Sequence, residues 1–149
     1  MPAADWKGQQ DKTMRSKPVI AYDDMHTPIG YFVGIGKAAD AQAINFMITA
    51  GRGLLYACMT EEQADKLRLI SKRTPDNGYL NKTVGVTIDY RTTTTGISAY
   101  ERADTIASLM ADRTIDDDYR RPGHVVPLIA CKEGMAARAG IAEIALELA

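Results

Sequence analysis

Residues 84–101 read VGVTIDYRTTTTGISAYE and combine a short apolar run with the start of a helix. The run at 84–89 is rich in β-branched residues and predicts a strand. Ser98 and Glu101 then have the spacing of a capping box, in which each side chain satisfies a free backbone N–H of the first helical turn. This stretch therefore predicts a strand followed by a helix that reaches about Ala111.

The same alternation of strands and helices continues on both sides of this stretch. We expect a hairpin of strands 19–22 and 31–36 joined by a turn at 27–30, and further strands at 54–59 and 124–130. Helices are expected at 41–50, after the N-cap Asp40 and ending in a left-handed Gly51 or Gly53, at 60–69 and at 141–148. The alternation is irregular and has no βαβ repeat, which favours an α+β fold, a mixed sheet packed with helices.

Composition places the chain among single-domain globular proteins. It has 149 residues, 46% hydrophobic and 25% charged, with a net charge of −1. We expect a flexible N-terminal arm at 1–17 and one domain at 18–149. The balanced charge gives no reason to expect a nucleic-acid partner, and no apolar stretch is long enough to cross a membrane. Without a signal-peptide pattern at the N-terminus, the expected location is the cytoplasm.

Four groups of residues are candidates for a functional site. Thr94 and Thr95 precede a helix, where hydroxyls and backbone N–H groups suit an anion, although threonine is also common in loops at strand ends. His124 follows a Pro-Gly turn and begins a strand, so it is a candidate acid/base group or, alternatively, a surface or capping histidine. Arg138 precedes the last helix and can share a phosphate with its N-terminus, or be simply solvated. The aspartates 116–118 can collect a hard cation or form a solvated turn.

The order of these motifs resembles the 3,4-dihydroxy-2-butanone 4-phosphate synthase family from about Pro18 onward. The matching segments are AINFM at 43–47, GRGL at 51–54, TEE at 60–62, TTGISA at 94–99, RA at 102–103, TI at 105–106, RPGHV at 121–125, PL at 127–128, RAG at 138–140 and Glu143. The resemblance implies an α+β fold and a homodimer with active sites at the subunit interface. It also implies conversion of ribulose 5-phosphate to formate and 3,4-dihydroxy-2-butanone 4-phosphate with magnesium.

The sequence departs from the family pattern in two places. After Asp23-Asp24 the family has a carboxylate-rich loop, approximately EDRENEGD, whereas residues 25–32 here read MHTPIGYF, with His26 the only titratable group. In the family motif RxGHTEA, a histidine binds magnesium and a threonine helps hold the phosphate; Ile141 and Ala142 stand there, while Arg138 and Glu143 match. The family pattern also continues past Ala149 into a further strand. We therefore expect no metal cofactor.

These observations predict a divergent member of the family that binds a phosphosugar or related small molecule and catalyses a specialised biosynthetic reaction. The expected catalytic residues are His124 and His26, and the expected substrate-binding residues are Thr94, Thr95, Arg138 and Glu143, with no metal ligand. One alternative is an active synthase that holds Mg²⁺ through Asp23, Asp24 or the aspartates 116–118. A second is a non-catalytic binding or partner subunit. The expected partners are a small phosphorylated molecule and a second copy of the chain.

Overall fold

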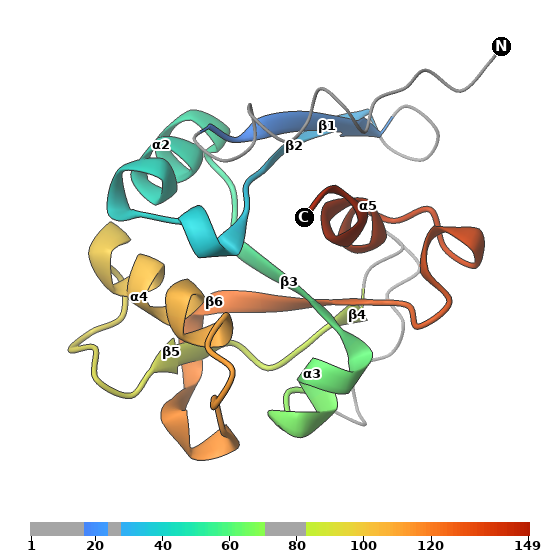
Figure 1. Cartoon of the computed structure of the whole chain (residues 1–149). Helices are drawn as coiled ribbons and strands as arrows, with labels where there is room; N and C mark the ends of the chain where they lie inside the picture. Colours follow the sequence, from blue (N-terminus) through green and yellow to red (C-terminus); the bar gives the residue numbers. More distant parts are fainter. Residues whose placement is uncertain (1–16, 24–27, 71–82) are drawn as a thin grey trace, which may run out of the picture.

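A computed structural model describes residues 17–23, 28–70 and 83–149, and Figure 1 shows the arrangement of its elements. The first two strands, β1 (Val19–Asp23) and β2 (Ile29–Val33), pair antiparallel with Val19 opposite Val33. The predicted hairpin is confirmed, although β2 begins at Ile29, inside the segment expected as a turn. Residues 24–27 lie outside the described residues, as does the expected N-terminal arm except for Lys17.

The main sheet is built around the long strand β6 (Tyr119–Ala130). On one side of it lies β3 (Tyr56–Thr60), which runs parallel. The short strands β4 (Thr83–Val84) and β5 (Ile88–Tyr90) pair antiparallel with different parts of β6. Parallel and antiparallel pairs in one sheet, together with the packed helices, confirm the α+β fold.

The segment 84–89, predicted as one strand, is divided between β4 and β5. The N–H of Gly85 donates to the Pro127 carbonyl at 2.9 Å, and the N–H of Val86 donates to the Leu69 carbonyl at 3.0 Å. These bonds to two different segments take residues 85–87 out of a regular ladder. The division therefore depends on contacts between distant parts of the chain, which the local pattern does not contain.

The described residues contain four α-helices packed on the strands, and each begins near a predicted start. They are α2 (Ala41–Gly51), α3 (Glu61–Lys66), α4 (Ala99–Leu109) and α5 (Ile141–Leu148). In the same part of the chain, three short 3-10 turns join the larger elements: η1 (Gly36–Ala38), η2 (Asp116–Asp118) and η3 (Gly134–Ala136). No helix among the described residues has the length and apolar character needed to cross a membrane.

The helix starts follow the predicted caps. The side chains of Asp40, Thr60 and Ser98 each accept the N–H three residues later, at 2.7, 3.2 and 3.2 Å. The end of α2 differs from the prediction: Arg52, with φ of 49°, takes the left-handed position expected for a glycine. Its N–H still reaches the Ile48 carbonyl at 2.9 Å, so the helix ends with the expected bond but a different residue.

Three apolar clusters of the described residues hold these elements together, and one of them packs Leu128 and Ala130 of β6 against Ala142 of α5. The largest joins α2, α3 and α4 to the sheet through buried residues that include Ile44, Met59, Leu67, Ile88 and Val125. The second lies between the β1–β2 hairpin and α5, where Ile141 packs against Val33 and Ala145. In Figure 1, α5 lies between the hairpin and β3. This packing fixes β6 between two groups of elements and positions the loops at its start.

Candidate active site

Residues 121–124, the RPGH motif, form a bulged segment of strand β6, which we call the RPGH loop. Ile88 of β5 pairs with Val125, but the next residue, Asp89, pairs with Arg120, so four residues of β6 have no partner on β5. The N–H of Gly123 donates to Oγ1 of Thr87 at 3.1 Å. A Cβ at Gly123 would overlap the backbone of Ile88 and Asp89. Glycine is therefore required here because the loop lies directly against β5.

The loop places His124 on the carboxylate of Asp89. Oδ1 of Asp89 accepts the backbone N–H of His124 at 2.8 Å, and Oδ2 lies 2.9 Å from Nδ1 of the imidazole. The Asp89 side chain is 6% exposed, whereas that of His124 is 39% exposed. A buried carboxylate thus holds an imidazole that is open to solvent on another side, an arrangement suited to acid/base chemistry.

The TTGIS motif covers the other side of the same carboxylate. Gly96 has φ of 76°, and a Cβ there would overlap the carboxylate of Asp89. Nη2 of Arg120 holds the loop by donating to the carbonyls of Thr93 and Thr94, at 2.7 and 3.0 Å, and to Oγ1 of Thr93 at 2.8 Å. The two motifs that carry the family resemblance therefore meet at Asp89.

Sequence reasoning missed Asp89, although it identified His124. In the sequence Asp89 is only the last residue of a predicted strand, and its bond to His124 spans 35 residues. The available signal was an acidic residue at a strand end immediately before the threonine-rich loop. This signal is weak without knowledge of which strand lies beside it.

Thr94 and Thr95 donate hydrogen bonds to a carboxylate of the chain itself. The N–H and Oγ1 of Thr94 donate to Oε1 of Glu101 at 2.5 and 2.7 Å, and Oγ1 of Thr95 donates to Oε2 at 3.3 Å. Hydrogen bonds from Thr94, and to a smaller extent from Ser98, lower the pKa of Glu101 to about 2. The anion at this helix start in the structure is therefore Glu101 of the chain itself.

Arg138 and Glu143 form a buried pair with each other. Nε of Arg138 lies 2.8 Å and Nη2 lies 2.6 Å from Oε1 of Glu143, with side-chain exposures of 12% and 0%. Arg138 also donates to Oγ1 of Thr83 and to the carbonyl of Ile129. Ile129 is five residues beyond His124 on β6, roughly 16 Å along an extended strand. These two predicted residues come together, but at a different part of the sheet from His124.

The remaining predicted groups are His26 and the aspartates 116–118. His26 lies outside the described residues. Asp116, in η2, pairs with Arg121 at 2.5 Å and with Arg68 at 3.6 Å, and Asp118 accepts the N–H of Ile115. Two of the three aspartates considered for magnesium thus have partners within the protein.

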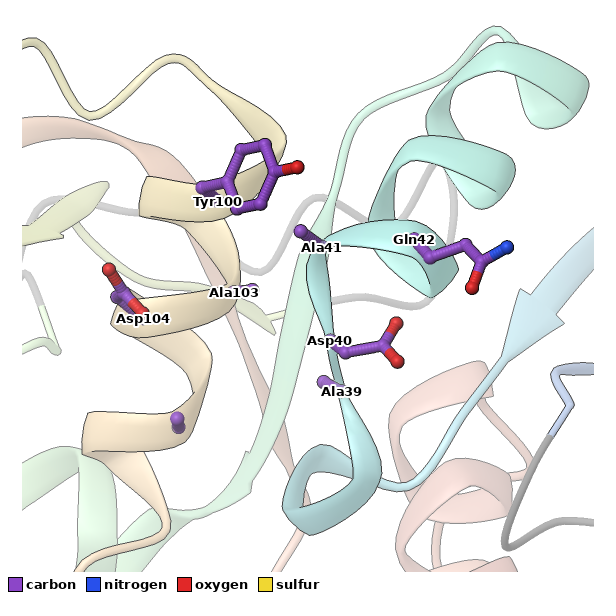
Figure 2. A pocket seen from close by; sticks show the side chains of 8 residues that line it. Ala39, Asp40, Ala41, Gln42, Tyr100, Ala103 and Asp104 are labelled. Atoms are coloured by element: carbon purple, nitrogen blue, oxygen red, sulfur yellow. The ribbon is translucent and has the colours of Figure 1, made fainter.

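A hollow of about 420 Å³ lies between the start of α2 and one side of α4. Figure 2 shows Tyr100 and Ala103 on α4 opposite Asp40 and Ala41, with Gln42 beside them. Asp40 uses its side chain to cap α2. None of the predicted site residues lines this hollow, so we do not assign the site to it.

Comparison with known proteins shows the family. The model of the family described as 3,4-dihydroxy-2-butanone 4-phosphate synthase matches residues 10–149. The chain belongs to this family. It is 39% identical over 140 residues to riboflavin biosynthesis protein RibBA of Bacillus subtilis, covering 93% of this chain and 35% of that protein. It is 41% identical over 136 residues to RibBA of Bacillus mycoides, covering 91% and 34%.

Solved synthases have the same fold. A 3,4-dihydroxy-2-butanone 4-phosphate synthase in complex with two magnesium ions is 30% identical, with a TM-score of 0.83, and the match covers 91% of this chain and 64% of that one. RibBX, a two-domain synthase from A. baumannii, is 34% identical with a TM-score of 0.82 over 91% of this chain and 40% of its own. This synthase-family chain thus spans about a third of the length of the curated relatives and less than two thirds of these solved chains.

The expectation that no metal cofactor is involved is wrong, because a structural relative this similar holds two magnesium ions. Among the described ranges, no three His, Cys, Asp or Glu side chains lie together in a way that could hold a metal. Asp89 and His124 bind each other and do not form a magnesium site by themselves. Residues 24–27, which follow the first strand, lie outside the described ranges.

Proposed function

We propose that this synthase-family chain binds a phosphorylated sugar and transfers a proton on it through His124. The observation that carries the proposal is the Asp89–His124 pair, in which a buried carboxylate at 2.9 Å holds a partly exposed imidazole. Histidine suits this role because its ordinary pKa lies near neutral pH. In this proposal His124 removes a proton next to the sugar carbonyl and returns a proton to the resulting enediol.

Phosphate recognition is assigned, as a proposal, to Thr94 and Thr95 at the start of α4. A phosphate that approaches this helix end would replace Glu101 as the acceptor of the threonine hydroxyls. For Arg138 and Glu143 the proposed contribution is to hold the first turn of α5 against β6, because their charged groups bind each other in the interior.

We further propose that the reaction differs from the formate-releasing reaction of the family. In the segment aligned with the family's carboxylate-rich loop, Ile29–Val33 form strand β2 and Phe32 packs edge-on against Phe46 at 5.4 Å. Ile141, aligned with a histidine of the family motif, packs in the apolar region between α5 and the hairpin. These apolar side chains cannot move protons, which supports a reaction with fewer acid/base groups.

Incubation with ribulose 5-phosphate and Mg²⁺ in D₂O tests both parts. Hydrogens beside the ketone exchange with solvent when a base removes them, so mass spectrometry of the sugar reports proton transfer and a formate assay reports the family reaction. We expect deuterium incorporation without formate, at a residual rate about 10²–10⁴-fold lower in His124→Gln. Formate release above the rate without the protein would instead establish an active synthase. Neither signal, with no heat of binding in calorimetry, would favour a non-catalytic subunit.

A second copy of the chain is the proposed protein partner. On β1, Ile20 and Tyr22 are 68% and 63% exposed, while Val19 and Ala21 on the opposite face pack toward α5. The hairpin therefore has an apolar inner face, which α5 covers, and an apolar outer face. The outer face supports the proposal of a partner that covers it. Light scattering should give about twice the chain mass of 16.3 kDa, and Ile20→Glu should shift it toward the monomer. Met135→Glu, at another exposed apolar residue, is the matched control.

A further inference from the structure

We propose that Asp89 is a positioning residue that fixes the imidazole of His124 with its proton on Nδ1, leaving Nε2 as the atom that accepts a proton from the substrate. The inference deepens the proposed function and rests on it for the role of Nε2. It is carried by the contacts of one carboxylate with two parts of the same histidine.

Both carboxylate oxygens of Asp89 contact His124. Oδ1 accepts the backbone N–H at 2.8 Å and Oδ2 lies 2.9 Å from Nδ1, so the contact fixes the main chain and the ring together. An ionised carboxylate only accepts hydrogen bonds, and Nδ1 must therefore be the donor. In a neutral imidazole the other nitrogen, Nε2, then carries a lone pair.

Asp89 is itself held in place by its strand and by the loop that covers its carboxylate. It lies in β5 between Ile88, which is fully buried, and Tyr90, whose N–H donates to Oγ1 of Thr105 at 3.0 Å. Gly96 covers the carboxylate so closely that no Cβ would fit there. With its side chain 6% exposed, Asp89 has little room for another rotamer or for competing water.

This arrangement defines the direction of proton movement. The proton leaves the substrate carbon with its electron pair remaining on the substrate, and it forms a bond to Nε2. The imidazolium that results has a proton on each nitrogen and lies beside the Asp89 carboxylate, which favours its charge. The proton then returns from Nε2 to the product, and Asp89 neither gains nor loses a proton.

Asp89→Asn tests the inference because it keeps the shape of the side chain and reverses one hydrogen bond. If the amide oxygen continues to accept the His124 N–H, the amide NH₂ faces Nδ1, which must then accept and leave the ring proton on Nε2. Ring ¹⁵N chemical shifts of neutral His124 distinguish the two forms. We expect the Nδ1–H form to predominate in the wild-type chain and the Nε2–H form in Asp89→Asn. Asp112→Asn, in an exposed turn after α4, should leave the wild-type form unchanged.

Deuterium exchange into ribulose 5-phosphate provides the second measurement. Asp89→Asn should lower kcat for exchange about 10²-fold or more, with a smaller change in KM. In a His124→Gln background the same substitution should have little further effect, because Asp89 acts through His124. A purely structural role would instead lower the rate by a similar factor in both backgrounds.

Several results would overturn the inference. They are an Nε2–H ring in the wild-type chain, an Nδ1–H ring that persists in folded Asp89→Asn, or equal effects of Asp89→Asn with and without His124. The wild-type spectrum needs no substitution, so it decides the point even if Asp89→Asn does not fold. Absence of any exchange by the wild-type chain would refute the proposed function, whereas the ring spectra would still test the position of the proton.

Discussion

Replacement of Gly96 by alanine should disturb both the stability of the chain and the candidate active site. Gly96 has φ of 76°, and Gly134 has φ of 66°. A left-handed conformation costs an alanine about 1–2 kcal/mol, so both substitutions incur this cost. Around Gly134 nothing lies within 4 Å of an added Cβ, whereas at Gly96 the Cβ overlaps the carboxylate of Asp89. Gly134→Ala is therefore a matched control for the backbone conformation.

The difference between the two variants measures the overlap. Overpacking of a fixed environment costs about 1–3 kcal/mol, and the change in the unfolded chain is the same for both substitutions. Gly96→Ala should therefore lower the free energy of unfolding by about 1–3 kcal/mol more than Gly134→Ala, as measured by urea denaturation followed by circular dichroism. It should also reduce the exchange activity assigned to His124. Equal unfolding free energies, within about 0.5 kcal/mol, would show that Gly96 does not press on Asp89.

Three further substitutions test the described contacts. Glu143→Gln leaves the buried guanidinium of Arg138 without its charged partner. It should lower the free energy of unfolding, measured by urea denaturation, by about 3–5 kcal/mol. Glu147→Gln, on the exposed side of α5, should change that free energy by about 0.5 kcal/mol or less. Glu101 has its pKa lowered to about 2 in the folded chain, so its contribution to stability is complete above pH 5 and is lost as the pH falls toward 2. The difference in melting temperature between wild type and Glu101→Gln should therefore shrink over that range, and a constant difference would contradict this cause. Asp40→Ala removes the cap of α2 and should lower the free energy of unfolding by about 1 kcal/mol. Asp104→Ala, at an exposed position of α4, should lower it by less.

The parts of the fold that could be predicted from sequence are those with local causes. Asp40, Thr60 and Ser98 each bond to a backbone N–H three residues away, and the three helices begin where these caps predict. The parts that could not be predicted depend on distant segments. Gly85 and Val86 bond to Pro127 and Leu69, and these contacts divide a segment that reads as one strand.

The same distinction applies to the candidate site. His124 could be identified from its own motif, because a histidine after a Pro-Gly turn is a local signal. Asp89 could not, since its role comes from the pairing of β5 with β6 and from the loop that removes residues 121–124 from that pairing. The sequence shows Arg138 and Glu143 only as charged residues near a helix start, and it does not show that their charges bind each other.

The contacts of the two family motifs explain what each glycine contributes. Gly123 allows the RPGH loop to lie against the backbone of Ile88 and Asp89, and Gly96 allows the threonine-rich loop to lie against the Asp89 carboxylate. Both motifs therefore build the surroundings of one buried acid, and His124 is the partly exposed group that this acid holds. A chain can keep both motifs for this purpose whatever reaction follows. For this reason the chemistry of the chain has to be tested at Nε2 of His124 rather than inferred from the motifs.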